Sequence, residues 1–480
     1  MGKNQWMKNV EMVLVFGFSL ALAIFAFRSS ASELKAGTAK AVITPSDPLG
    51  RILVMGGPAK GVKHDLYARA LVLDDGTRKM VIVTYDLNCL DVATPILRAR
   101  CRRELGIDPA YLLLLATHNH AAPIQIVPAN FDYGRLLADK IFSLVKEAIA
   151  NEQGPVRLFF GSTSVDFLRS DPRYPQVYGF LGRPVDSELQ LLKVMQGDQP
   201  LALLFNLPTH PMQTSFSKIE PGHPGYAVEE LEKRFPGTLA MYADGCGADQ
   251  FANIGVVMLA PLWLVKQLSA KIADAVEKIS RGRMTEVSGP LNSKLEVISL
   301  PLAPPVSHEQ AQKLAKNIPK DIGFVPYPEK DRGSNWIRSL LEHYEQKLPF
   351  PTRSDDYICT DDGFLLKELP EPREFPCRYE ETIVASIGPM VLVAMQGEVC
   401  APIGKRVKET FRNQKPLMVF AYMGEHNLYI PTRRLVEVNA YQAQVIQTQY
   451  ASPVGWSPEV EDAMVDGVNK LIESLTGGLP

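Results

Sequence analysis

The sequence predicts an α/β protein with mixed sheets, flanking helices and a site at the carboxyl ends of its strands. Short apolar segments of strand length alternate with longer segments whose apolar residues recur at helical spacing. Asp75-Gly76 separates two of the apolar segments and is a strong hairpin signal. Several other apolar segments end directly in histidine or carboxylate residues. Ligands in α/β proteins bind outside the carboxyl ends of strands, so we expect these ends to share one site.

The first half of the chain is expected to hold mainly strands and hairpins. A strand over 36–45 is stopped by its terminal proline. The other elements expected here are a hairpin over 66–87, helices over 94–105 and 133–150, a strand over 156–167, and a hairpin over 189–207.

The second half adds a longer, less regular stretch. Proline, lysine and tyrosine become more frequent between 291 and 379, which indicates a subdomain excursion with a strand near 295–302 and helices near 308–317 and 336–346. The other expected elements are helices over 225–234, 258–279, 405–412 and 459–475, and strands over 238–243, 382–387, 390–395 and 417–423.

The segment Leu112–Pro123 carries the clearest chemical signal. Its apolar start reads as a buried strand that runs directly into His118 and His120. If the extended conformation persists, both imidazoles lie on one face, where they would form half of a metal site. The alternative is a polar strand end with two solvated histidines.

Other strands are expected to end in a similar way. Histidine is not a favoured turn former, so His118, His120 and His210 are poorly explained as turn residues. The full set of strand-end residues is Asp86, His118, His120, His210, Asp244, Asp249, Glu398, Glu425 and Tyr429. Five or six such ends indicate one shared, metal-capable site.

The N-terminus has the pattern of an export signal. Lys3 and Lys8 precede the apolar stretch Met12–Phe27, and small residues follow around Ala31. We therefore expect a signal peptide over 1–31 and an α/β domain over 32–480. Arg28 leaves the alternative of an uncleaved membrane anchor. In either case the body would lie outside the cytoplasm, as a periplasmic, secreted or anchored protein.

Composition and cysteine spacing limit the other classes of function. The chain has 480 residues and a net charge of −2, without basic runs, so nucleic acid is not an expected partner. None of the six cysteines forms a CxxC pair, which excludes a cysteine-rich zinc module. Export makes disulfides feasible, and Cys359 with Cys377 is the expected pair.

Short motifs spread over the body from Ala36 to Gln444 point to one family. Residues 117–123 read Thr-His-Asn-His-Ala-Ala-Pro, close to the Thr-His-Thr-His-Ser-Gly-Pro of the neutral/alkaline ceramidases. The other segments that resemble this family, in its order and at similar spacing, are Ile43-Thr44-Pro45, Tyr67-Ala68-Arg69-Ala70, Arg169-Ser170, Thr209-His210-Pro211, Gly225-Tyr226-Ala227, Gly397-Glu398 and Leu428-Tyr429. The chain therefore resembles the catalytic domain of zinc-dependent amidases that cleave N-acyl sphingosine.

The resemblance implies a ligand set and a substrate site. It makes the zinc ligands His118, His210, Glu398 and Tyr429, and it places His120 and Arg169 against the substrate. His120 would then act as general acid or base, and Arg169 would hold an oxyanion or a substrate carboxylate.

Two departures from the family change the expected chemistry. Phe251 stands where the family has its nucleophilic serine, and the family's β-rich C-terminal domain has no counterpart after the tyrosine segment. The leading expectation is an exported hydrolase that cleaves an amide or ester bond of a small or lipid-like substrate with a zinc-activated water. The alternative is a non-catalytic ceramidase-like binding protein that keeps the metal. An HNH-type nuclease, read from His118-Asn119-His120, is disfavoured by the net charge.

Overall fold

The computed structural model describes most of the chain that follows the N-terminal segment. The described residues are 33–480, without 126, 213–214, 216, 257, 317–331, 348–356, 361–362, 367–375, 426–427, 451 and 478–480. The expected signal peptide over 1–31 lies outside them. Among the described residues, none of the helices combines the length and apolar character needed to span a bilayer.

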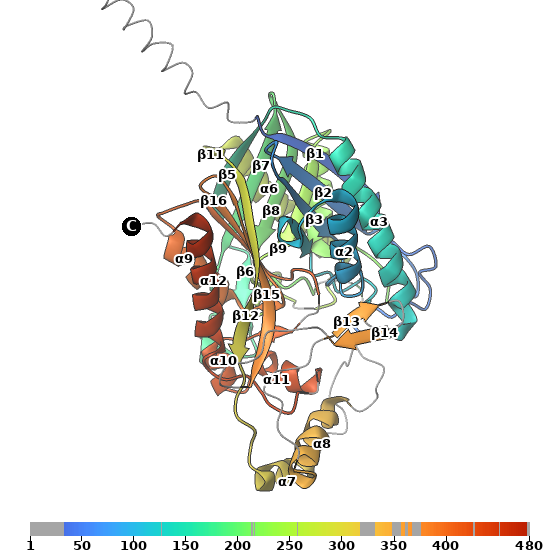
Figure 1. Ribbon diagram of the computed structural model, residues 1–480, viewed down its shortest axis with the longest axis vertical. Helices are drawn as coiled ribbons and strands as arrows, with labels where there is room; N and C mark the ends of the chain where they lie inside the picture. The colour runs from blue at the N-terminus through green and yellow to red at the C-terminus, as the bar shows by residue number, and fades with distance from the viewer. Residues whose placement is uncertain are drawn as a thin grey trace, which may run out of the picture.

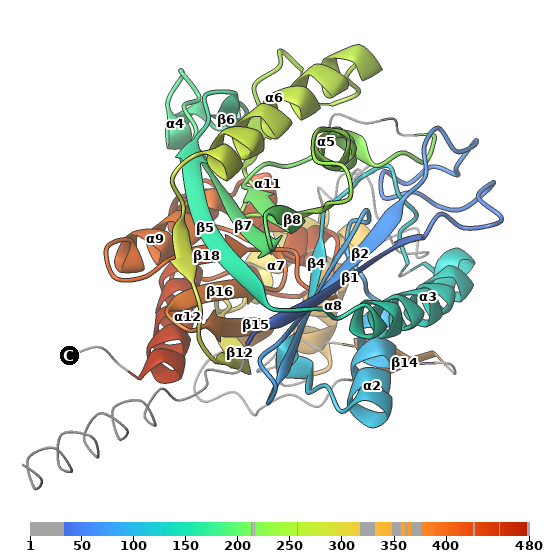
Figure 2. The same ribbon diagram turned by 90° about the horizontal axis from the view of Figure 1, so that it is seen from above.

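The first of three main sheets comes from the N-terminal part of the chain. Its order is β1-β2-β3-β4, formed by Lys35–Val42, Tyr67–Asp74, Lys79–Tyr85 and Leu112–Ala116. The predicted hairpin is confirmed as the antiparallel pair β2–β3, and β4 then adds parallel to β3. Helices α2 (Ala93–Leu105) and α3 (Phe131–Ala150) lie against this sheet (Figure 2).

The second sheet contains the other predicted hairpin. Its order is β11-β5-β7-β8-β9, formed by Thr285–Val287, Val156–Ser164, Glu188–Gln196, Gln199–Leu207 and Leu239–Asp244. The hairpin is the antiparallel pair β7–β8, and β9 lies parallel to β8. Helices α5 (Gly222–Arg234) and α6 (Leu262–Arg281) cover its outer face (Figure 2).

The third sheet has the order β12-β15-β16-β18, formed by Leu291–Pro301, Cys377–Ile387, Met390–Met395 and Leu417–Phe420. Helices α9 (Ala401–Phe411) and α12 (Val460–Thr476) lie beside it (Figure 1). Because β12 pairs along its whole length with β15, the first strand of the expected 291–379 excursion belongs to this sheet. The division of the chain into domains stays a prediction.

Cys377 is a free, buried cysteine, so the expected pairing with Cys359 is not formed.

Shorter elements complete the fold. The remaining part of the excursion contains α7 (His308–Lys316) and α8 (Arg332–Glu345), which lie together at one end of the molecule (Figure 1), and the hairpin β13–β14 (Tyr357–Thr360 and Gly363–Leu366). Two small sheets pair β6 (Leu168–Ser170) with β10 (Gln250–Ala252), and β17 (Glu398–Val399) with β19 (Tyr429–Ile430). The other short helices are η1 (Pro109–Tyr111), η2 (Pro128–Asn130), α4 (Pro175–Tyr178), α10 (Arg433–Glu437) and α11 (Tyr441–Thr448).

The three main sheets share one apolar core. Leu113 of the first sheet, Leu204 of the second and Leu392 of the third are fully buried in the same cluster. Each sheet also contains one parallel strand pair: β3–β4, β8–β9 and β16–β18. The segments that follow β4, β8 and β16 leave the sheets toward a common point. This arrangement brings residues that are distant in sequence to one site, as the strand-end pattern predicts.

Polar side chains fix the second sheet against the third. The amide of Gln190 on β7 donates to the carbonyl of Leu417 at 2.7 Å, and the amide of Asn206 on β8 donates to the carbonyl of Val419 at 2.7 Å. Both acceptors belong to β18, which is the last strand in the order of the third sheet. These bonds satisfy backbone groups that would otherwise be unpaired inside the protein, which is costly.

Candidate metal centre

His118 follows β4 but does not continue the strand. β4 ends at Ala116, and His118 has a φ of 56°, which is uncommon for any residue except glycine. The expectation that both histidines share one face of an extended strand is therefore wrong. Asn119 holds the turn, because its side-chain amide donates to the carbonyls of Asp86 and Glu220 at 3.1 and 2.8 Å. Strained backbone of this kind is concentrated at functional sites.

The ring of His118 is fully buried and held in one orientation. Its Nδ1 lies 3.3 Å from the carbonyl oxygen of Asn88 and donates to it. The ring stacks on Tyr422 with the centroids 4.0 Å apart. Burial lowers the pKa of His118 to about 3, so the imidazole is neutral and Nε2 is left free to bind a metal.

His210 is held in a corresponding way at the end of β8. Its backbone N–H donates to the carbonyl of Gln250 at 2.7 Å, and its ring makes a hydrogen bond to the backbone of Gly247. Burial also lowers the pKa of His210 well below its usual value. The Nδ1 atom of His210 has no hydrogen-bond partner among the described residues, so this nitrogen is the one available to a metal.

Glu398 and Tyr429 reach the same point through a small parallel sheet. They are register partners in the β17–β19 pair, and the phenol of Tyr429 hydrogen-bonds the carboxylate of Glu398. Oε2 of Glu398 lies 3.2 Å from Nε2 of His118 and 3.7 Å from Nδ1 of His210. Burial raises the pKa of Glu398 to about 8. The structure therefore brings all four sequence-predicted ligand residues together.

The free atoms at this point fit a metal ion. Nε2 of His118, Nδ1 of His210 and Oε2 of Glu398 are all buried, and none has a hydrogen-bond partner among the described residues. Most buried polar atoms in proteins are satisfied, so three unsatisfied atoms facing one another need an explanation. Two ligands of a tetrahedral zinc lie about 3.3 Å apart, since zinc–nitrogen bonds are roughly 2.0–2.1 Å long. The separations of 3.2 and 3.7 Å suit that geometry.

His120 was expected to act only as an acid or base, but its imidazole also lies close enough to the centre to bind the metal. The ligand atoms of His118, His120 and His210 all lie within 4.8 Å of one another, which makes the three histidines a candidate metal-binding group. Nδ1 of His120 lies 3.0 Å from the carbonyl oxygen of His118, so Nε2 is the nitrogen that faces the centre. The side chain is 6% exposed and can therefore contact both the metal and a substrate.

Arg169 lies beside the centre, on the strand that pairs with Phe251. Arg169 and Phe251 are register partners in the antiparallel β6–β10 pair, so their side chains project to the same side. The ring of Phe251 contacts that of His210, with the centroids 5.6 Å apart. Nε of Arg169 is buried and lacks a hydrogen-bond partner among the described residues. The guanidinium is thus available to an anionic group next to the metal centre.

Asp249 has a structural role at this site. It accepts hydrogen bonds from the hydroxyl of Tyr178 and, at 2.7 Å, from the backbone N–H of Ala401. Ala401 is the first residue of α9, three residues after Glu398, so the contact fixes the turn after β9 against the segment that carries the glutamate. Burial raises the pKa of Asp249 to about 6.

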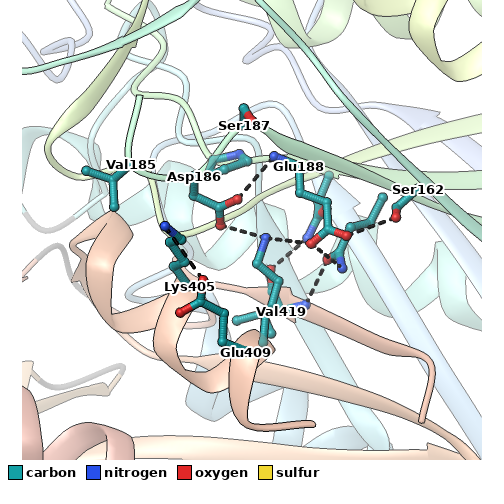
Figure 3. A network of polar contacts seen from close by, with 12 residues as sticks. Ser162, Val185, Asp186, Ser187, Glu188, Lys405, Glu409 and Val419 are labelled. Atoms are coloured by element: carbon teal, nitrogen blue, oxygen red, sulfur yellow. Dashed lines mark hydrogen bonds and ion pairs between the residues drawn. The ribbon is translucent and has the colours of Figure 1, made fainter. Parts of the chain in front are cut away.

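A buried ion-pair network holds the other end of α9 (Figure 3). Nζ of Lys408 lies 2.6 Å from Asp186 and 3.1 Å from Glu188, and the hydroxyl of Ser162 donates to Glu188 at 2.9 Å. The Lys408 side chain is 8% exposed, so its charge depends on these two carboxylates for compensation. The Lys408 network therefore fixes α9, and with it Glu398, against the second sheet.

Sequence reasoning missed several residues around the centre. Asn88 was not among the expected strand-end residues, although its backbone carbonyl orients His118. Tyr441 contacts the ring of Tyr429 at 5.5 Å between centroids, and the guanidinium of Arg173 lies 5.2 Å from the centroid of Tyr441. No local pattern marks these residues, since each reaches the site from a distant segment.

Comparison with solved structures identifies the same fold in two ceramidases. Neutral ceramidase from Pseudomonas aeruginosa aligns with a TM-score of 0.66 over 92% of this chain and 74% of its own, at 16% sequence identity. A ceramidase described as complexed with C2 aligns with the same score and identity, over 92% of this chain and 75% of its own. No protein-family model and no curated protein sequence matches the chain. The ceramidase-like α/β fold expected from the sequence motifs is confirmed.

Proposed function

Starting from the ceramidase fold, we propose that the chain is an exported zinc-dependent hydrolase that cleaves an amide or ester bond in an N-acyl, lipid-like substrate. The observation that carries this proposal is the convergence of unpaired, buried ligand atoms from His118, His210 and Glu398 on one point. A site without an ion would leave these atoms unsatisfied at considerable cost. The two structural neighbours are ceramidases, which supports an amide substrate.

The zinc ligands in this proposal are His118, His210, Glu398 and Tyr429. When bound, zinc would lower the pKa of a water ligand and polarise a carbonyl group. The two imidazoles are neutral because they are buried, and each is oriented by a backbone carbonyl bonded to its other nitrogen. Tyr429 is hydrogen-bonded to Glu398, so this phenol also orients the carboxylate.

His120 and Arg169 are the proposed reacting residues of the chain. His120 is held through Nδ1 by the carbonyl of His118, so Nε2 can accept or return a proton beside the centre. The unpaired guanidinium nitrogen of Arg169 can hold the developing oxyanion or a substrate carboxylate. Phe251 supplies no hydroxyl, so the reaction would use water as the nucleophile and form no acyl-enzyme.

The alternative is a non-catalytic binding protein with the same fold and metal. Phe251 favours this alternative, because a buried aromatic ring occupies the place of the family serine and packs on His210. The aromatic ring narrows the space beside the centre, and it would exclude a substrate that needs that room. In this case the metal centre would be structural.

Metal analysis together with turnover separates the two functions. The purified chain is expected to hold about one zinc and to hydrolyse at least one member of a panel of N-acyl substrates. Replacing His120 with alanine should lower kcat by about 10²- to 10⁴-fold with the metal retained. Ser170→Ala is the matched control, since its hydroxyl bonds the carbonyl of Arg183 and not the centre. Zinc without any turnover would favour the binding protein, and zinc loss in the His120 variant would make that residue a ligand.

A further inference from the structure

One turn of the chain presents two large apolar side chains to water. Phe180 is 93% exposed and Leu181 is 81% exposed, against 71% for Leu49, the next most exposed large apolar residue described. Both lie between Gly179 and Gly182, whose φ values of 78° and 53° allow the chain to reverse. The N–H of Gly182 donates to the carbonyl of Gly179 at 3.1 Å and closes the turn. We refer to residues 179–182 as the apolar turn.

The apolar turn is braced on both sides. The carbonyl of Gly182 accepts from the N–H of Ser170 at 3.1 Å, and the hydroxyl of Ser170 donates to the carbonyl of Arg183 at 2.7 Å. On the other side, the guanidinium of Arg434 donates to the carbonyls of Gln176 and Val177 at 3.0 and 3.2 Å. The two apolar side chains are therefore held in an exposed position by a fixed base.

The base of the apolar turn is also the wall of the metal centre. Arg169, which precedes Ser170 on β6, pairs in register with Phe251 beside His210. On the far side of α4, the hydroxyl of Tyr174 accepts from the N–H of Tyr441 at 2.7 Å. The ring of Tyr441 in turn contacts the ring of the proposed ligand Tyr429. The turn is thus connected to the candidate centre through β6 on one side and through α4 and Tyr441 on the other.

The surroundings of the apolar turn are positively charged. Arg173 forms an ion pair with Asp171 at 2.6 Å, and Nε of Arg169 is buried beside the candidate centre, so Arg183 is the cation of residues 169–183 that is left for a partner. Arg183 directly follows the turn and is exposed, and Arg434 adds a further cation at its base. An exposed apolar tip with a cationic base is complementary to a lipid surface with anionic headgroups.

We propose that the apolar turn docks the protein on a lipid surface, with Phe180 and Leu181 inserted among the acyl chains and Arg183 at the anionic headgroups. This contact would hold the candidate metal centre close to the lipid surface. It is separate from any contact made by the apolar stretch Met12–Phe27. The proposal does not require hydrolysis, so it can fail or hold independently of the proposed activity.

A tryptophan placed in the apolar turn tests the insertion directly. The Phe180→Trp variant of the full chain is mixed with vesicles of phosphatidylcholine and phosphatidylglycerol, and the emission of the wild-type protein with its four native tryptophans is subtracted. We expect a blue shift on vesicle addition and quenching by lipids with brominated acyl chains. The effect should be weaker with pure phosphatidylcholine and at high salt. Leu136→Trp on α3, an exposed position on the opposite side of the molecule from α4 in Figure 2, is the control and should show neither effect.

A second measurement determines how much the apolar turn contributes to vesicle binding. Replacing Phe180 and Leu181 together with serine should lower the apparent vesicle partition coefficient by at least about 10-fold, since two large apolar side chains leave the lipid. Unchanged emission from the tryptophan variant, or wild-type partitioning of the double-serine variant, would overturn the proposal. A blue shift that depends on protein concentration without vesicles would also overturn it, because a second copy of the chain would then cover the turn.

Discussion

Replacing His118 with asparagine tests the ligand set with little disturbance of the backbone. His118 has a φ of 56°, a conformation that asparagine tolerates and alanine does not, so His118→Asn keeps the turn while removing the imidazole. Zinc bound by four protein ligands contributes roughly 10–16 kcal/mol, or about 2.5–4 kcal/mol for each ligand. At about 1.4 kcal/mol for each factor of ten, we expect zinc affinity to fall by about 10²- to 10³-fold.

The assay is competition for zinc against a chelator of known affinity, read as metal content after dialysis. His308→Asn is the control, because His308 lies on α7 and stacks on Tyr344 rather than joining the histidine group. Circular dichroism of both variants verifies that the fold is kept. Wild-type zinc affinity in His118→Asn, with the fold intact, would refute the ligand assignment.

Three further predictions follow from other contacts. Asn119→Ala should weaken zinc binding by about 10- to 100-fold in the same competition assay, since it removes the side-chain amide that holds the turn at His118 through the carbonyls of Asp86 and Glu220. Lys408→Met should lower the unfolding free energy in urea by about 3–5 kcal/mol, because it leaves the buried carboxylate of Asp186 and the partly buried carboxylate of Glu188 without a cation, and an unchanged midpoint would contradict the stabilising role of the network. Residues 1–40 fused to a reporter that is active only after export should give an active reporter, and an inactive one would count against export.

The sequence was sufficient to identify the strands and the residues at their ends. His118 and His210 follow apolar segments of strand length, and those segments are β4 and β8 in the structure. Residues at strand ends are expected to converge when the sheets contain parallel strand pairs. The pairs β3–β4 and β8–β9 are parallel, and the two histidines do converge. Glu398 and Tyr429 also appeared among the strand-end residues, but the family motifs were needed to assign them as ligands, because the two-residue strands β17 and β19 are too short to leave a periodic signal.

Several boundaries could not be predicted because distant residues set them. Helix α9 starts at Ala401 rather than near 405, since Asp249 in the turn after β9 accepts the hydrogen bond of its first N–H. Strand β18 ends at Phe420 rather than near 423, because the next N–H pairs with the carbonyl of Asp244 and Tyr422 takes a φ of 55°. Local propensity contains no information on such long-range contacts.

The proposed metal ligands follow strands of three different sheets, and this has a consequence for how the protein unfolds. An ion bound to His118, His210 and Glu398 would cross-link segments that follow β4, β8 and β16, and so tie the three sheets together at one end of their common core. Only the fully assembled protein offers this set of ligands, so the ion stabilises the complete arrangement and no single sheet. With the ion removed, the sheets depend on packing, on the bonds from Gln190 and Asn206 to β18, and on the contacts of Lys408 and Asp249 with α9. Heating should then separate them in steps, whereas the metal-bound protein should melt in one cooperative transition.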